Sequence, residues 1–468
     1  MQQRLAAALE KHLPGIGSLV RFDRLSAGAS QETYRLVVES GGVERKLALR
    51  RLAGGVWNEG VAEAARAGVR TEAELFRLAR AAGVPEPEVL AVLERDDGLG
   101  EGFVMEWLEG ETLGARIVRS ESLAKVRPRL ARQCGEILAR IHAIDVQTTG
   151  LVDKLDTVTP RAFVEQTYAG YKLLATPQPM IDYTARWLLD HLPEAPRMAL
   201  VHNDFRNGNV MVGPEGVVAV LDWELAHIGD PMRDLGWICT NSWRFGRRDL
   251  PVGGFGETAD LFAGYESVSG RKVDAAQVKF WEVFGSFWWA IGCLGMANQF
   301  RIGPDRSVER AAIGRRSSEC QVDCVNLLIP GPVDVIEAPK TRASSDLPAL
   351  DELVQGVRDL LHGELMSATE GRLQFMARVS GNALDIVLRE LAVGGEHRRR
   401  ERERLCGLLG RDADLDSLRR QLVEVLRDGS MDLAAPGLAE HLRATVVNQV
   451  AIDQPRYSGF LAAAAHAG

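Results

Sequence analysis

Cysteine is scarce in this sequence of 468 residues. Only six cysteines occur, and no two of them form a CxxC pair. Structural zinc sites and thioredoxin-like redox motifs usually contain such pairs, so the sequence favours neither. Cys320 and Cys324 lie four residues apart and fit one face of a helix as two small apolar residues. Scattered cysteines are typical of a reducing compartment, and we expect a cytoplasmic protein.

The chain also lacks a long hydrophobic run and an excess of positive charge. The most apolar stretch, 283–297, is shorter than the roughly 20 residues of a membrane helix and is interpreted as a buried core helix. The net charge of −8 gives no general attraction to nucleic acid or to anionic membranes. The charged run 397–404 contains Glu401 and Glu403, which favours a solvated helix face or loop over a nucleic-acid patch. We therefore expect neither nucleic acid nor membrane as a partner.

Length and patterning predict several structural units. A chain of 468 residues exceeds one ordinary core. Short alternating runs and one helical stretch at 60–82 predict antiparallel strands around a helix near the N-terminus. Helical patterns dominate afterwards, and Pro330-Gly331-Pro332 marks a linker. We predict an α+β fold with units at 1–108 and 109–329, a linker at 330–346 and an all-helical C-terminal domain at 347–468.

The most informative window is 200–237, where two β-type runs are each followed by polar residues. The polar residues of interest are His202, Asp204, Asn209, Asp222 and Glu224. The first three form an H-x-D-x-x-x-x-N pattern, which has the spacing of a kinase catalytic loop. Because Asp222 ends the following β-type run, the set is more specific than the spacing alone.

Phosphoryl transfer requires these residue types. Mg²⁺ prefers hard oxygen ligands, so Asn209 and Asp222 fit metal-binding roles, with Glu224 as a further ligand candidate. A separate carboxylate must accept the proton of the attacking hydroxyl, and Asp204 fits that role. His202 and Arg206 complete the catalytic candidates, although a structural role is equally compatible with His202.

In this window the sequence resembles the aminoglycoside phosphotransferase and related small-molecule kinase family, over about residues 20–330. The motifs that carry the resemblance are 201–209, 220–224 and 229–235. The resemblance implies a two-lobed protein-kinase-like fold that uses ATP and Mg²⁺ and phosphorylates a hydroxyl of a small molecule. It also implies that Asp204 is the catalytic base.

The segment DWELAHIGDPMRDLGW, residues 222–237, resembles one branch of that family, the phosphotransferases associated with acyl-CoA dehydrogenases. That branch suggests hydroxyacyl or hydroxyacyl-CoA acceptors. Asp230 and Asp234 in this segment are expected to be structural: they would hold the loop and cap the next helix.

The resemblance also assigns nucleotide-binding positions in the first lobe. Gly28 and Ser30 lie where the family has its phosphate-covering loop, although a GxGxxG motif is absent. Glu106 and Leu108 border the expected hinge, whose backbone would contact adenine.

Arg50 occupies the position of the family's lysine. An arginine can bind phosphate through two parallel hydrogen bonds, so nucleotide binding is compatible with this change. Glu72 is the expected ion-pair partner of Arg50, and Glu74 is the alternative.

Two other functions stay open. With Arg50 in place of lysine, the chain could be a nucleotide-binding scaffold or pseudokinase that acts through its C-terminal domain. A metal-dependent hydrolase could use His202, Asp204 and Asp222. The helices of 347–468 could shape the acceptor site, form a homodimer or bind a protein partner, and the sequence does not decide among these.

Overall fold

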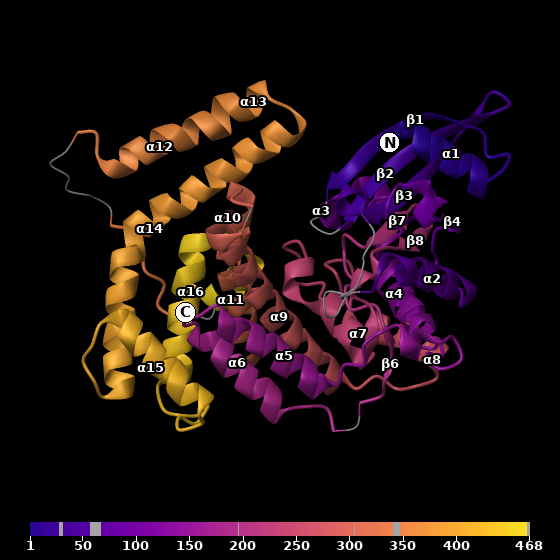
Figure 1. Ribbon diagram of the computed structural model, residues 1–468. Coiled ribbons are helices and arrows are strands. Elements are labelled where there is room, and N and C mark those ends of the chain that lie inside the picture. Colours follow the sequence, from indigo (N-terminus) through magenta and orange to yellow (C-terminus); the bar gives the residue numbers. More distant parts are fainter. Residues whose placement is uncertain (28–30, 57–66, 195, 304, 340–346, 466–468) are drawn as a thin grey trace. The chain divides into compact units, whose positions relative to one another are not determined.

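The computed structural model describes residues 1–27, 31–56, 67–194, 196–303, 305–339 and 347–465 (Figure 1). The chain divides into two compact units. Unit 1 comprises residues 1–160 and 194–281, and unit 2 comprises residues 161–193 and 282–468. This division places the segment 161–193, which forms two helices, in the same unit as the C-terminal helices. It differs from the predicted domain boundaries, which stay predictions.

Unit 1 begins with helix α1 (Gln2–His12) and a five-stranded antiparallel sheet in the order β1-β2-β3-β5-β4. Helix α2 (Val69–Ala81) lies between β3 and β4 in the chain. The predicted antiparallel meander is confirmed. The helix predicted over 60–82 corresponds to α2, and its first positions, 60–66, lie outside the described residues. The strands are β1 Ser18–Ala27, β2 Gln31–Ser40, β3 Val43–Leu52, β4 Val89–Val92 and β5 Gly102–Glu106.

The two faces of this sheet contact different helices. Leu47 and Leu49 of β3 belong to the core that includes the apolar side of α1. Side chains alternate along a strand, so Arg50 points to the opposite face. On that face Phe103 of β5 packs against Phe76 of α2, with ring centroids 5.7 Å apart. The pleat of the sheet therefore directs Arg50 towards α2.

The rest of unit 1 is mainly helical and contains two short antiparallel ladders, β6 with β9 and β7 with β8. The β-type runs at 199–202 and 217–221 correspond to β6 and β8. Strands β7 and β9 have four and three residues, too few for a clear alternating pattern. The elements are α3 Gly114–Arg119, α4 Arg127–Ile141, β6 Ala199–Val201, β7 Val210–Gly213, β8 Gly216–Val220, β9 His227–Gly229, α7 Met232–Cys239 and α8 Thr258–Ser269.

Unit 2 is built from helices (Figure 1). Its core contains leucines and valines of α11, α14, α15 and α16, among them Val325, Leu405, Leu422 and Val447. Among the described helices, none is both long and apolar enough to cross a membrane. The helices are α5 Pro160–Leu173, α6 Pro179–Asp190, α9 Ala275–Ile302, α10 Val308–Arg315, α11 Ser317–Leu328, α12 Leu350–Leu360, α13 Met366–Ala368, α14 Gly371–Leu409, α15 Leu415–Arg427, α16 Leu438–Asp453 and α17 Ser458–Ala464.

Two sequence-based expectations for unit 2 need adjustment. The run 397–404 lies in α14, but Glu401 is only 1% exposed and accepts two hydrogen bonds from Arg419, at 2.7 and 2.6 Å. A buried carboxylate needs such a partner, and the partner lies on another helix. The start of the predicted linker is also packed, because Val333 is buried in the core and Arg443 donates to the Pro332 carbonyl at 2.9 Å.

Candidate active site

Asp234 of α7 holds the backbone of the segment that follows β6. Its carboxylate accepts hydrogen bonds from the backbone N–H of His202 at 2.8 Å and of Asn203 at 2.7 Å. It also contacts His142 Nε2 at 3.0 Å. Burial alone would raise the pKa of Asp234, but the hydrogen bonds and charge interactions with His142 and His202 together outweigh it, and the pKa lies below its usual value. The structural role expected for Asp234 agrees with this geometry.

His202 connects the two loops of the site. Burial lowers the pKa of His202, so the ring is neutral near pH 7. Its Nδ1 accepts from the Asp204 N–H at 3.2 Å, which leaves Nε2 to donate to the Leu221 carbonyl at 3.1 Å. His202 is fully buried, so it positions the backbone of Asp204 relative to the strand that precedes Asp222.

The Asp204 carboxylate is oriented by three donors. Its Oδ1 accepts from Arg206 Nε and from the Trp237 indole, both at 2.9 Å. Its Oδ2 accepts from Asn209 Nδ2 at 2.6 Å. Since a carboxylate oxygen has two lone pairs, these bonds fill Oδ1, whereas Oδ2 can still accept a further hydrogen bond. Asp204, Arg206 and Asn209 therefore form one cluster, as their spacing predicted.

Asn209 and Asp222 are brought together through the main chain. The N–H of Leu221 donates to the Asn209 carbonyl at 2.7 Å, which places Asp222 next to this contact. Asn209 uses its amide nitrogen on Asp204, so its amide oxygen stays available as a ligand. Asp222 has a left-handed backbone (φ 70°), and its side chain is 30% exposed.

Arg50 bridges two carboxylates. Its Nε lies 2.8 Å from Glu72 Oε1, and its terminal nitrogen Nη2 lies 2.5 Å from Asp222 Oδ1. Burial alone would lower the pKa of Arg50, but the charges of Glu72 and Asp222 outweigh it and raise the pKa. The charge of the Glu224 carboxylate also raises the pKa of Arg50, so Glu224 belongs to this charged cluster.

The alternative partner of Arg50, Glu74, is excluded. Its carboxylate pairs with Lys154 instead, at 2.7 and 2.6 Å. Glu74 lies two positions after Glu72 on α2, and positions two apart on a helix point in different directions. Glu72 is completely buried and also accepts from Gln31 Nε2 at 3.0 Å.

The other nucleotide-binding candidates are only partly described. Glu106 ends β5, and its N–H donates to the Glu88 carbonyl at 2.9 Å. Leu108 follows in a segment without regular secondary structure, where neither its N–H nor its carbonyl pairs with backbone of the described chain. Gly28 and Ser30 lie outside the described residues.

The donor set can be compared with what a metal needs. In the part of the chain that the structure describes, no three or more His, Cys, Asp or Glu residues gather as a metal site. That excludes a zinc-like cage there, which the hydrolase hypothesis would need. Mg²⁺ usually takes only one or two carboxylates and completes its shell with water and phosphate oxygens. Asn209 and Asp222 fit this smaller requirement.

Two tryptophans at the site were missed as site residues by the sequence analysis. Trp237 bonds Asp204 directly, and Trp243 packs its ring 4.2 Å from the Arg206 guanidinium carbon. Trp237 lies one helical turn after Asp234, and this spacing was the available signal.

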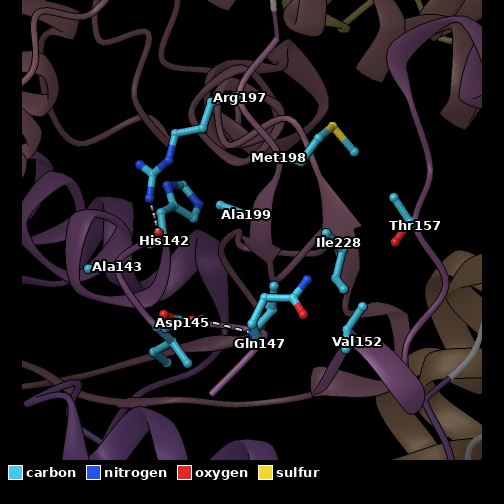
Figure 2. Close-up of a pocket in the computed structure, with 12 residues that line it drawn as sticks. His142, Ala143, Asp145, Gln147, Val152, Thr157, Arg197, Met198, Ala199 and Ile228 are labelled. Atoms are coloured by element: carbon cyan, nitrogen blue, oxygen red, sulfur yellow. Dashed lines mark hydrogen bonds between the residues drawn. The ribbon is translucent and has the colours of Figure 1, made fainter. Parts of the chain in front are cut away.

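A separate hollow of about 490 Å³ lies in unit 1. It is lined by His142 and the residues after it, together with Arg197 and Ile228. Figure 2 shows Arg197 at its wall, where the guanidinium donates to the His142 carbonyl at 2.7 Å. Asp145 also lines it, but accepts from the backbone of Gln147 at 2.8 Å. No predicted site residue lines this hollow, so it is distinct from the cluster around Asp204.

Comparison with known proteins agrees with this geometry. A relative in Mus musculus, acyl-CoA dehydrogenase family member 10, is 32% identical over 249 residues, or 51% of this chain and 22% of the relative. Acyl-CoA dehydrogenase family member 11 of Rattus norvegicus is 30% identical over 263 residues, 53% of this chain and 32% of the relative. The chain thus spans between a fifth and a third of these relatives. The resemblance to the branch associated with acyl-CoA dehydrogenases is confirmed.

The fold has a counterpart among solved structures. An aminoglycoside-phosphotransferase-like protein of Ralstonia eutropha is 24% identical, with a TM-score of 0.55 over 70% of this chain and 98% of that chain. A domain of unknown function matches residues 367–457, within the helical C-terminal region. The model of the phosphotransferase enzyme family matches residues 21–270. The predicted kinase-like fold is confirmed, and the chain belongs to the phosphotransferase enzyme family.

Proposed function

We propose that this phosphotransferase moves the γ-phosphate of ATP to a hydroxyl group of a small molecule and requires Mg²⁺. The observation that supports the proposal most is the environment of Asp204. Three side-chain donors fix its carboxylate, and the Asn209 amide oxygen remains available beside it, next to the Asp222 carboxylate, which contacts Arg50 through Oδ1. Phosphoryl transfer needs this combination of an oriented base and oxygen ligands.

In this proposal Asp204 accepts the proton of the acceptor hydroxyl. The Trp237 and Arg206 bonds to Oδ1 and the Asn209 bond to Oδ2 hold the carboxylate plane in one orientation. Such positioning lowers the barrier because the base need not reorient when the hydroxyl arrives. His202 acts on the backbone rather than on the proton, because it is fully buried and neutral.

Nucleotide and metal are assigned to the neighbouring residues. Asn209, Asp222 and Glu224 would hold Mg²⁺, which supplies charge neutralisation at the phosphates when it is bound. Arg50 would contact phosphate oxygens through the part of its guanidinium that now reaches Asp222. The backbone of Leu108 would meet adenine, since it makes no backbone hydrogen bond in the described chain. Gly28 and Ser30 stay predictions as part of the phosphate-covering loop.

The acceptor is proposed to be a hydroxyacyl compound or its CoA thioester. The support is the similarity to chains whose names place them in the acyl-CoA dehydrogenase family. The cytoplasm is the proposed location, which the six free cysteines support.

One observation favours a second function, a nucleotide-binding scaffold without turnover. Arg50 contacts both Glu72 and Asp222, and the contact with Asp222 Oδ1 measures 2.5 Å. A metal ion would compete with Arg50 for that oxygen. If Arg50 keeps Asp222 Oδ1 when nucleotide is present, nucleotide would bind without a correctly placed metal ion.

The test is ADP release by the full chain with Mg-ATP and a panel of hydroxyacids, hydroxyacyl-CoAs, amino alcohols and aminoglycosides. We expect release that depends on one acceptor class and disappears in Asp204→Asn, which keeps the size of the side chain. Acceptor-independent binding of nucleotide with no release across the panel would favour the scaffold. A chain that binds no nucleotide at all would refute both functions.

A further inference from the structure

Helix α12 of unit 2 exposes a continuous apolar stripe. Leu350, Leu353, Val357 and Leu360 are between 46 and 65% exposed, and none of the eleven residues of α12 is buried. Their spacing of three, four and three residues is that of the a and d positions of a heptad. A π-helical turn at Leu361–Leu365 adds one residue to the register, so the exposed Leu365 continues the stripe.

The arm that carries this stripe cannot cover it. We define the arm as residues 350–391, which comprise α12, the π-helical turn, α13 and the first part of α14. Figure 1 shows α12 and α14 side by side in this arm. Within its part of α14, Ala377 and Gly381 are the buried residues, while Leu373, Val387 and Leu391 are at least 41% exposed. Two helices alone bury too little apolar surface, whereas four helices can enclose a core.

We propose that the arm is a homodimer interface, in which α12 packs antiparallel against α12 of a second copy. The a and d positions of α12 are symmetric about Gln355. In an antiparallel pair, Leu350 therefore lies opposite the partner's Leu360, and Leu353 lies opposite the partner's Val357. Every layer then joins an a position to a d position, as antiparallel coiled coils require. This is an isologous contact, in which each copy contributes the same patch.

The charge distribution around the stripe is compatible with contact to a second copy and unfavourable for contact with an anionic membrane. The stripe and its flanking residues Ala349, Val354, Gly356, Leu361 and Gly363 carry no charge, so two identical faces meet without repulsion. Away from the stripe, residues 350–368 carry four acids and one arginine, which pairs with Asp385 of α14; these are Asp351, Glu352, Asp359, Glu364 and Arg358. Helices that lie on anionic membranes carry lysines and arginines there instead.

The small residues on one flank allow a close approach. A Cβ atom added at Gly356 or Gly363 would meet no atom within 4 Å, so that flank is open. The area that α12 and the adjacent part of α14 present together lies just below that of a standard stable interface. At about 1.5 Å per residue, residues 350–368 extend about 28 Å, and two adjacent helices are about 20 Å wide. Two copies would cover roughly 1,100 Å² of flat area, close to the roughly 1,200 Å² at which stable interfaces begin.

The test is the mass of the full chain in solution, by light scattering after size-exclusion chromatography over a range of concentrations. We expect about twice the chain mass of 51.2 kDa. The variant Leu353→Glu with Val357→Glu should be a monomer, with unchanged helix content because α12 contains no buried residue. The matched control is Gln355→Glu, which adds a charge on the outer side of the same helix and should remain a dimer.

The register has its own test. The double variant Leu353→Cys with Val357→Cys should form a disulfide-linked dimer under mild oxidation, and the wild type with its six cysteines is the control. A wild-type chain that is a monomer at every concentration would overturn the proposal. A dimer that survives the two glutamates would overturn it as well, because another face would then form the contact. Neither result depends on phosphotransferase activity.

Discussion

Asp234→Ala should lower the free energy of unfolding of unit 1 more than any surface substitution does. The carboxylate is completely buried and accepts from the N–H groups of His202 and Asn203, at 2.8 and 2.7 Å, and contacts His142 at 3.0 Å. Its removal leaves two buried N–H groups unsatisfied, at about 1–3 kcal/mol each, and a histidine without its acceptor. The expected loss is about 3–6 kcal/mol.

Thermal unfolding followed by tryptophan fluorescence measures this loss. For a unit of this size, about 3–6 kcal/mol corresponds to a fall in Tm of roughly 10 °C or more. Asp249→Ala is the matched control, because the Asp249 side chain is 65% exposed and pairs with Arg247 at the surface. It should change stability by no more than about 0.5 kcal/mol. Asp234→Asn keeps one acceptor oxygen and should lie between the two.

The effect should depend on pH in a defined direction. The pKa of Asp234 is lower in the folded chain than its usual value. Its stabilising contribution is therefore fully present above about pH 4, the unfolded pKa, and is lost as the pH falls through the folded value. The wild type and Asp234→Ala should converge in stability under strongly acidic conditions. An Asp234→Ala variant within about 1 kcal/mol of the wild type at pH 7 would refute the reasoning.

Three further predictions concern the site and unit 2. Asn209→Ala should raise the Mg²⁺ concentration needed for half-maximal activity at least about tenfold, because one oxygen ligand is lost; a magnesium titration of activity with an unchanged midpoint would argue against the assignment. Trp237→Phe removes one of the two bonds to Asp204 Oδ1 and should lower kcat about tenfold with the KM for ATP unchanged. Arg419→Met leaves Glu401 buried without this partner and should destabilise unit 2 by about 3–5 kcal/mol, measured by urea unfolding. The control Arg420→Met, which replaces the exposed neighbouring arginine, should have little effect.

The sequence predicted those parts of the structure that local pattern determines. Short alternating runs identified the antiparallel strands, including the one that holds Arg50, and the fixed spacing from His202 to Asn209 identified the cluster around Asp204. Asp234 was recognised as structural from its motif. In each case the physical determinant lies within a few residues of the chain, so one sequence is sufficient.

Features that depend on distant partners were not visible. Strand β9 pairs with β6, which is more than twenty residues away, and neither strand has more than three residues. Glu401 looked solvated because its run is highly charged, but Arg419, on a separate helix, donates two hydrogen bonds that make its burial acceptable. The indole of Trp237 reaches Asp204 across thirty-three positions. Such contacts are set by tertiary packing, which overrides local pattern.

The central claim is tested most directly by phosphorus NMR of the full chain with Mg-ATP and hydroxyacyl-CoA or the other panel acceptors. We predict a new phosphomonoester resonance that grows in step with ADP and is absent with Asp204→Asn. ADP formed together with free phosphate, and no phosphomonoester on any acceptor, would contradict the proposed transfer to a hydroxyl group.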